Sequence, residues 1–148
     1  MKERTLNTEN SQSILKLHKV YIRNLGYKIG KVSSKLEFVN IDRKYAFNLS
    51  YETIEDIICI TLSAKISTDE TDEMLEIGVC GEFSIQNSSD LDFNDKPIIS
   101  EILTKNAVSI LFPYLRTYTS LLSGMTKTSS IEIPVFNINK IFENSPKE

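Results

Sequence analysis

The residues that could carry out acid–base, metal or thiol chemistry are few in this chain and widely spaced. His18 is the single histidine, so no two-histidine zinc motif exists and one imidazole alone is available for proton transfer. The two cysteines, Cys59 and Cys80, lack the CxxC spacing that indicates zinc. We therefore expect a structural histidine and two reduced thiols, with a disulfide between the thiols as the alternative.

Acidic residues cluster in two segments that predict loops rather than metal sites. Residues 67–73, STDETDE, form a charged turn in which solvated carboxylates are expected. The sequence DLDFND, with Asp90, Asp92 and Asp95, partly resembles a calcium-binding loop. It lacks the glycine and the distal glutamate that such a loop requires. We expect no bound metal in either segment.

The glycines, at positions 26, 30, 78, 81 and 124, do not form a phosphate-binding motif. Neither GxxxxGK[ST] nor GxGxxG can be written, which predicts no ATP or dinucleotide site and no cofactor. Paired catalytic groups are also missing from the sequence. We therefore expect that the protein is not an enzyme.

Length and composition indicate one globular domain. The chain has 148 residues, of which 41% are hydrophobic and 25% charged, enough to bury a core without disulfides or metals. The net charge of −3 disfavours a nucleic-acid partner. No run of about 18 apolar residues predicts membrane insertion, and the polar N-terminus has no apolar run before Ile14 to form a secretory signal. We expect a cytoplasmic protein with a disordered segment at 1–13 and a single domain at 14–148.

Alternating apolar and polar residues predict four strands. In the first, residues 14–29, one side carries Leu15, Leu17, Tyr21 and Leu25 and the other His18, Val20 and Ile22, so we expect partial cover on both faces. The next three runs alternate cleanly, and short connections between them predict an antiparallel meander. Their inward residues are Tyr45, Phe47, Leu49 and Tyr51, then Ile58, Ile60, Leu62, Ala64 and Ile66, then Leu75, Ile77, Val79, Phe83 and Ile85.

Residues 98–123 change to spacings of three and four, which predicts a long helix. Its apolar stripe comprises Ile102, Leu103, Val108, Leu111, Leu115, Tyr118, Leu121 and Leu122. Pro113 either removes one hydrogen bond in the middle of this helix or begins its second half, and Gly124 is a natural end. A short second helix is predicted after Pro134. The order of strands first and helices afterwards predicts an α+β fold in which helices cover one face of the sheet.

The segment ILFPYLR, residues 110–116, resembles a motif of the SecB family of protein-export chaperones. That family has an ILFPYAR helix, a break containing glycine, an apolar stretch ending in PV, and a short helix closing with LF. The corresponding residues here are Pro134 and Val135, then Ile141 and Phe142. GEFSI (81–85) is similar to the family's GGIFSI, and LKLHKVYIRNL (15–25) resembles its first strand. The resemblance extends over about residues 14–142.

This resemblance implies a four-stranded antiparallel sheet followed by a long helix and a short C-terminal helix, assembled as a homotetramer that is a dimer of dimers. The long helix would pack between subunits through Pro113, Tyr114, Thr117, Tyr118 and Leu121. Unfolded or precursor polypeptides would bind in apolar grooves formed by the connection after the first strand and by the short helix; the alternative is that these residues complete the core of the monomer. The candidate client-binding residues are Leu36, Phe38, Val39, Ile41, Phe136, Ile138, Ile141 and Phe142.

Family members that serve the secretion ATPase present acidic residues on the outward face of the first and last strands. The corresponding positions here are Asn24 and Lys28 on the first strand and Met74 and Glu76 on the last. An amide and a cation in place of two carboxylates would weaken attraction to a basic partner and could repel it. The translocase-binding surface is therefore expected to differ from that of such members.

Three functions are consistent with these features. The first is an ATP-independent holdase that binds unfolded preproteins reversibly for export, with linked grooves that gain affinity through effective concentration. The second is a SecB-like chaperone dedicated to one client, such as an antitoxin. The third is a SecB-fold oligomeric interaction protein without holdase activity.

Overall fold

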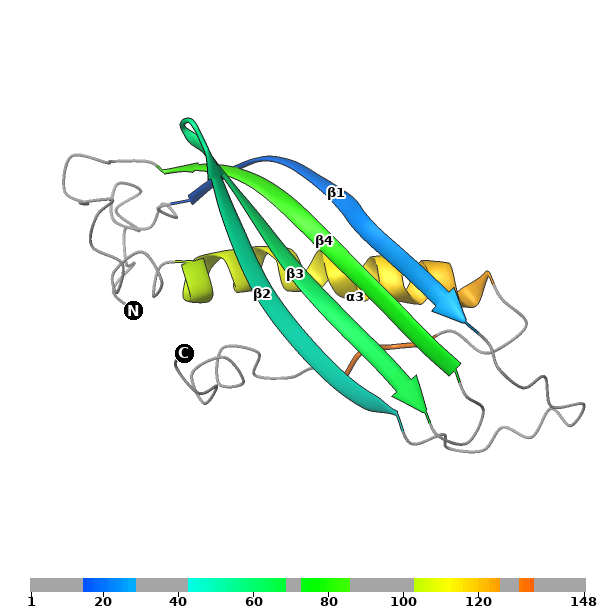
Figure 1. Cartoon of the computed structure of the whole chain (residues 1–148). Coiled ribbons are helices and arrows are strands. Elements are labelled where there is room, and N and C mark those ends of the chain that lie inside the picture. Colours follow the sequence, from blue (N-terminus) through cyan, green and yellow to red (C-terminus); the bar gives the residue numbers. More distant parts are fainter. Residues whose placement is uncertain (1–14, 29–42, 69–72, 86–102, 126–130, 135–148) are drawn as a thin grey trace, which may run out of the picture.

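A computed structural model describes residues 15–28, 43–68, 73–85, 103–125 and 131–134 of the chain. The strands β1 (Leu15–Lys28), β2 (Lys44–Ile54), β3 (Ile57–Thr68) and β4 (Glu73–Ile85) form one sheet in the order β1-β4-β3-β2. Every neighbouring pair is antiparallel, and the helix α3 (Val108–Gly124) crosses one face of the sheet (Figure 1). The predicted α+β architecture is confirmed. The predicted short helix after Pro134 and the segment 1–13 lie outside the described residues.

The face of the sheet turned toward α3 is apolar, because the register aligns the inward residues of the strands in rows. In one such row Tyr27 pairs with Leu75, Leu75 with Ile66, and Ile66 with Tyr45. The inward residues predicted for β3 and β4 belong to the hydrophobic core or pack against it. β2 is an edge strand: Tyr51 is paired with Ile60 and therefore lies on the inward face as predicted, but its side chain is 55% exposed.

Two β-bulges in β1 correct the predicted alternation of that strand. The register with β4 shifts between Leu17 and Lys19 and again between Ile22 and Asn24. Each extra residue reverses which face the following side chains occupy. Val20 and Ile22 therefore pack on the core together with Leu17, whereas Tyr21, predicted on the side of Leu15 and Leu17, is paired with Cys80 on the opposite face.

The first half of α3 packs on the sheet as the helical spacing predicts, whereas the second half uses smaller residues than expected. Phe112 meets Phe47 of β2 edge-on, with ring centroids 6.1 Å apart. Beyond Leu115 the predicted Leu121 is 62% exposed. The buried residues of α3 are Val108, Leu111, Phe112, Leu115, Thr119 and Ser123.

Pro113 lies inside α3 rather than at its start, so the first of the two expectations for this residue holds. A π-helical turn, η2 (Leu103–Ala107), precedes α3, and the helix ends at Gly124 as predicted. None of the helices in the described part of the chain combines the length and apolar character needed to cross a bilayer.

The extended segment 131–134 is held against α3 by two hydrogen bonds between its backbone and side chains of the helix. Arg116 donates from Nε to the carbonyl oxygen of Ile133 at 2.9 Å. The backbone nitrogen of Ile131 donates to Oγ of Ser123 at 2.6 Å. Because both isoleucine side chains are buried, the segment closes the core beside the helix.

Candidate functional site

The outer face, defined as the face of the sheet turned away from α3, brings together the four residues predicted to contact a translocase. Asn24 is paired with Gly78, and Lys28 is paired with Met74, across β1 and β4. Glu76 lies between these two rows, opposite Gly26. All four predicted residues are exposed. They therefore form one continuous patch on the outer face.

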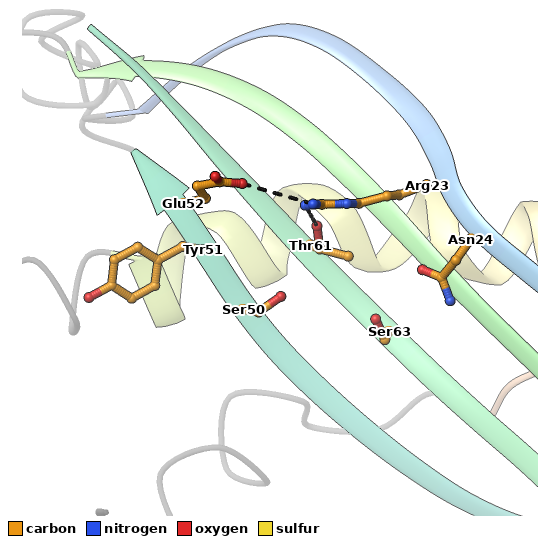
Figure 2. A pocket seen from close by; sticks show the side chains of 7 residues that line it. All are labelled: Arg23, Asn24, Ser50, Tyr51, Glu52, Thr61 and Ser63. Carbon is orange, nitrogen blue, oxygen red and sulfur yellow. Dashed lines mark hydrogen bonds and ion pairs between the residues drawn. The ribbon is translucent and has the colours of Figure 1, made fainter. Parts of the chain in front are cut away.

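The position of the Asn24 side chain depends on the absence of a side chain at Gly78. A Cβ atom on Gly78 would collide with Oδ1 of Asn24 and would lie 3.1 Å from Oγ of Ser63. The Asn24 amide thus lies over the backbone of β4 and points toward the centre of the sheet, as Figure 2 shows.

Arg23 crosses the outer face from the edge strand β1 toward β2. Its Nη1 donates to Oγ1 of Thr61 on β3 at 3.4 Å, and its Nη2 lies 3.9 Å from a carboxylate oxygen of Glu52 on β2 (Figure 2). A shallow open pocket of about 450 Å³ surrounds this bridge, with Ser50 and Ser63 in its lining. The sequence did not reveal Arg23 as a bridging residue, because it lies in a bulge that the alternation does not predict.

The histidine and the two cysteines lie on the outer face near the start of β1. Among the described residues, they do not form a catalytic or metal-binding group. Nε2 of His18 lies 2.7 Å from Oγ of Ser84. Both thiols are free and buried, and burial, together with the neighbouring Cys80, raises the pKa of Cys59. Among the described residues, no group of three His, Cys, Asp or Glu side chains could hold a metal ion.

Tyr21 covers the buried thiol of Cys80 from the outer side of the sheet. A hydrogen bond with Cys80 and partial burial raise the pKa of Tyr21 to about 12. Nζ of Lys19 lies 5.5 Å from the centroid of the Tyr21 ring, within the range of a cation–π contact. The neutral forms of the phenol and of the Cys59 thiol are therefore favoured, which suits a structural role.

The surface of α3 turned away from the sheet carries the residues predicted to form an oligomer interface. Pro113, Thr117 and Leu121 are exposed, and Tyr114 is 39% exposed with its ring 6.3 Å from that of Tyr118. Tyr118 also packs partly against the core. An open groove of about 490 Å³ separates this side of α3 from the segment 131–134 and is lined by Pro113, Arg116, Thr117, Ser120, Leu121, Glu132 and Ile133.

The eight residues predicted to bind clients lie outside the described residues, in the segments 29–42 and 135–148. Their role stays a prediction from the sequence.

A four-stranded antiparallel sheet of order β1-β4-β3-β2 with one long helix across its inner face defines an α+β fold. The chain is 24% identical over 118 residues to the protein-export protein SecB of Aromatoleum aromaticum, a match that covers 76% of this chain and 70% of that protein. No family model matches the chain.

The fold is also that of a SecB-like chaperone from Mycobacterium tuberculosis, solved in complex with a ChAD peptide from the HigA1 antitoxin. The two structures match with a TM-score of 0.68 at 9% identity, over 82% of this chain and 90% of that one. A protein of unknown function from Streptococcus agalactiae matches with a TM-score of 0.37 at 12% identity, over 82% of this chain and 97% of that one. The chain is therefore SecB-like in sequence and in fold.

Proposed function

We propose that the protein is an ATP-independent cytoplasmic holdase that binds unfolded or precursor polypeptides. The observation that carries the proposal is the SecB-like relationship, which extends over most of the chain in sequence and in fold. We further propose that the protein is not an enzyme and requires no cofactor. Without hydrolysis to drive release, clients would bind reversibly and leave by mass action.

A homo-oligomer, arranged as a dimer of dimers, is part of this proposal. Large apolar side chains on and after α3 are turned to solvent, with Leu121 62% and Met125 83% exposed. Together with Tyr114, 39% exposed on the same helix, they form a group of exposed apolar side chains, and a contiguous patch of this kind is typical of a surface covered by a partner. Several client grooves in one assembly would raise affinity, because a bound client reaches a second groove without another diffusional search.

Holding of clients is tested by suppression of aggregation of a chemically denatured protein at stoichiometric amounts and without ATP. We expect full suppression at about one oligomer per client. The triple variant Phe38→Ser, Ile138→Ser and Phe142→Ser should lose this activity while keeping its native mass. If the wild-type protein leaves aggregation unchanged, the holdase proposal is wrong and a structural interaction protein is the remaining function.

The oligomer is tested on the exposed surface of α3 with Leu121→Lys. Native mass spectrometry should show a shift toward smaller assemblies, since a charge at a covered apolar contact is costly. Ser109→Lys is the matched control, because Ser109 is an exposed residue in the first turn of the same helix. An unchanged assembly in Leu121→Lys would exclude this side of α3 as the interface.

The second candidate is a chaperone dedicated to one client, such as an antitoxin. It is favoured by the structural match to a SecB-like chaperone that binds an antitoxin peptide, and by Asn24 and Lys28 at positions where acidic residues would attract the export ATPase. Binding to that ATPase separates the two candidates. We expect weak binding by the wild type and stronger binding by the double variant Asn24→Asp and Lys28→Glu. Strong binding by the wild type would favour export.

A further inference from the structure

We propose that Met125, at the end of α3, is a site of reversible oxidation by hydroperoxides, and that the sulfoxide formed there weakens the association of α3 with a second copy of the chain. This proposal rests on the homo-oligomer proposed above, because it requires a partner that covers this side of the helix. The oxidation state of one side chain would then control how much of the protein is assembled.

The sulfur-bearing side chains of the described residues fall into two classes by exposure. Cys59 is 7% exposed and Cys80 is fully buried, whereas Met74 and Met125 are 37% and 83% exposed. Burial also raises the pKa of Cys59, which keeps its thiol in the less reactive protonated form. An oxidant dissolved in water therefore reaches the thioethers of the two methionines and is kept from the thiols by the fold.

The proposed step transfers one oxygen atom to the thioether of Met125. The O–O bond of the hydroperoxide breaks and its terminal oxygen bonds to sulfur. The other oxygen takes the proton and leaves as an alcohol, or as water when the oxidant is hydrogen peroxide. Sulfur gives up two electrons to the peroxide. Methionine sulfoxide reductases catalyse the reverse change, in which a dithiol becomes a disulfide and the oxygen leaves as water.

Met125 continues the exposed side of α3 one turn beyond Leu121. Residues four apart lie on the same side of a helix, and Tyr114 lies on that side about three turns before Met125. Exposure along this side rises from 39% at Tyr114 to 62% at Leu121 and 83% at Met125. The backbone of Met125 is helical, and its nitrogen donates to the carbonyl oxygen of Leu122 at 3.3 Å. The thioether is therefore held at the most exposed end of an apolar stripe.

A sulfoxide at this position opposes burial in an interface. The methionine thioether is apolar and adapts its shape to a partner surface, whereas the sulfoxide is polar and disrupts such contacts. Its oxygen must give up water when a partner covers it, and Leu121, one turn away, has no side-chain donor to replace that water. In an isologous interface the same contact occurs in both copies. We expect the dissociation constant of the assembly to rise at least about tenfold.

Oxidation and assembly compete for the same side of α3. The thioether of Met125 is exposed in the separate protomer and covered in the proposed oligomer, so oxidation removes protomers from the equilibrium by mass action. Met74 lies on the outer face of the sheet, away from α3, and is an internal reference. The rate of oxidation of Met125 relative to that of Met74 should therefore fall as the protein concentration rises.

The test treats the whole chain with hydrogen peroxide, locates the added oxygen by peptide mass spectrometry, and measures assembly by native mass spectrometry over a dilution series. The oxidised wild type should dissociate at a protein concentration at least about tenfold above that of the untreated protein. Met125→Leu keeps an apolar side chain of similar volume and should assemble equally well before and after treatment. Met74→Leu is the matched control and should dissociate on oxidation as the wild type does.

The outcomes separate this inference from the oligomer proposal. A single protomer before any treatment would overturn both. An untreated oligomer that keeps its mass after Met125 is oxidised would overturn the role of Met125 alone, and so would equal dissociation of oxidised wild type and oxidised Met125→Leu. Recovery of the original mass after treatment with a methionine sulfoxide reductase would support a reversible modification, whereas permanent dissociation would attribute the effect to other damage.

Discussion

The hydroxyl of Ser123 lies 2.6 Å from the backbone nitrogen of Ile131, eight residues further along the chain. The same hydroxyl donates to the carbonyl oxygen of Thr119, one turn earlier in α3, at 2.6 Å. Because Ser123 is fully buried, one small side chain satisfies a buried backbone donor and connects the end of the helix to the segment 131–134.

Ser123→Ala should destabilise the protein by about 1–3 kcal/mol, because the buried nitrogen of Ile131 would lose its acceptor. Urea denaturation measures the change. Ser109→Ala is the matched control: its hydroxyl also donates to a carbonyl oxygen four residues earlier, that of Lys105 at 2.7 Å, but the residue is exposed. Equal effects of the two substitutions would show that the connection to Ile131 contributes nothing.

Gly81→Ala should cost about 1–3 kcal/mol through overpacking. A Cβ atom there would lie 2.5 Å from Cε2 of Phe83 and 2.9 Å from Cδ2 of Leu111, so the contact between β4 and α3 would have to open. Gly26→Ala, where the Cβ atom meets no atom within 4 Å, is the control in β1 and should be neutral or slightly stabilising. Thermal unfolding of the two variants measures the difference in stability. A Gly81→Ala protein as stable as Gly26→Ala would contradict the close contact between β4 and α3 at Gly81.

The two arginine–carboxylate pairs of the described residues should differ in their contribution to stability. Nε of Arg43 lies 3.7 Å from Oε1 of Glu73, whose side chain is 3% exposed. Arg43→Met would leave that carboxylate buried without a cation and should cost about 3 kcal/mol, the lower end of the usual range, since the pair is long. Glu52→Gln, in the exposed pair with Arg23, should cost less than about 1 kcal/mol.

A double variant checks the cause of this difference. Arg43→Met combined with Glu73→Leu removes both charges and should recover much of the stability lost in Arg43→Met, since buried ion pairs are often replaceable by apolar residues. Urea denaturation of all variants completes the comparison. A double variant less stable than Arg43→Met would mean that the stability lost in Arg43→Met does not come from a Glu73 carboxylate left without a cation.

Stability should fall at high pH because Tyr21 keeps its proton more tightly in the native state. The hydrogen bond with Cys80 and burial raise the pKa of Tyr21 to about 12 from 10.0. With the folded pKa above the unfolded one, the contribution is complete below about pH 10 and is lost as the pH rises through about 12. Between these values the wild type should lose more stability than Tyr21→Phe, measured by urea denaturation at each pH. Parallel curves for the two proteins would mean that the phenol ionises as freely in the fold as in the unfolded chain.

Much of the sheet could be predicted from the sequence, because β3 and β4 are buried on one face and alternate strictly. The alternation correctly predicts the inward and outward residues of these strands and the exposure of Met74 and Glu76. For β1 the prediction is wrong, because the apolar residues of that strand advance by two, three, two and three from Leu15 to Leu25. A strict alternation cannot reproduce this series, whereas two bulges do.

The candidate surfaces were predictable only in part. Alternation gives the face on which Glu76 lies, but its neighbours across the sheet depend on the register, which a single strand does not encode. In α3 the large residues indicated the buried stripe up to Leu115, and the two small residues that continue it, Thr119 and Ser123, carry no hydrophobic signal. Their burial follows from the close approach of the segment 131–134.

The two bulges of β1 also make that strand difficult to pair wrongly during folding. They divide it into three pieces whose apolar side chains alternate in different phases along the chain. If the strand slid by one position along β4, its leucines and isoleucines would face water, and losing one bulge would leave at least one piece inverted. A slip by one position, or the loss of one bulge, therefore exposes apolar side chains that the native register buries, and molecules mispaired in these ways should be less stable than the native one.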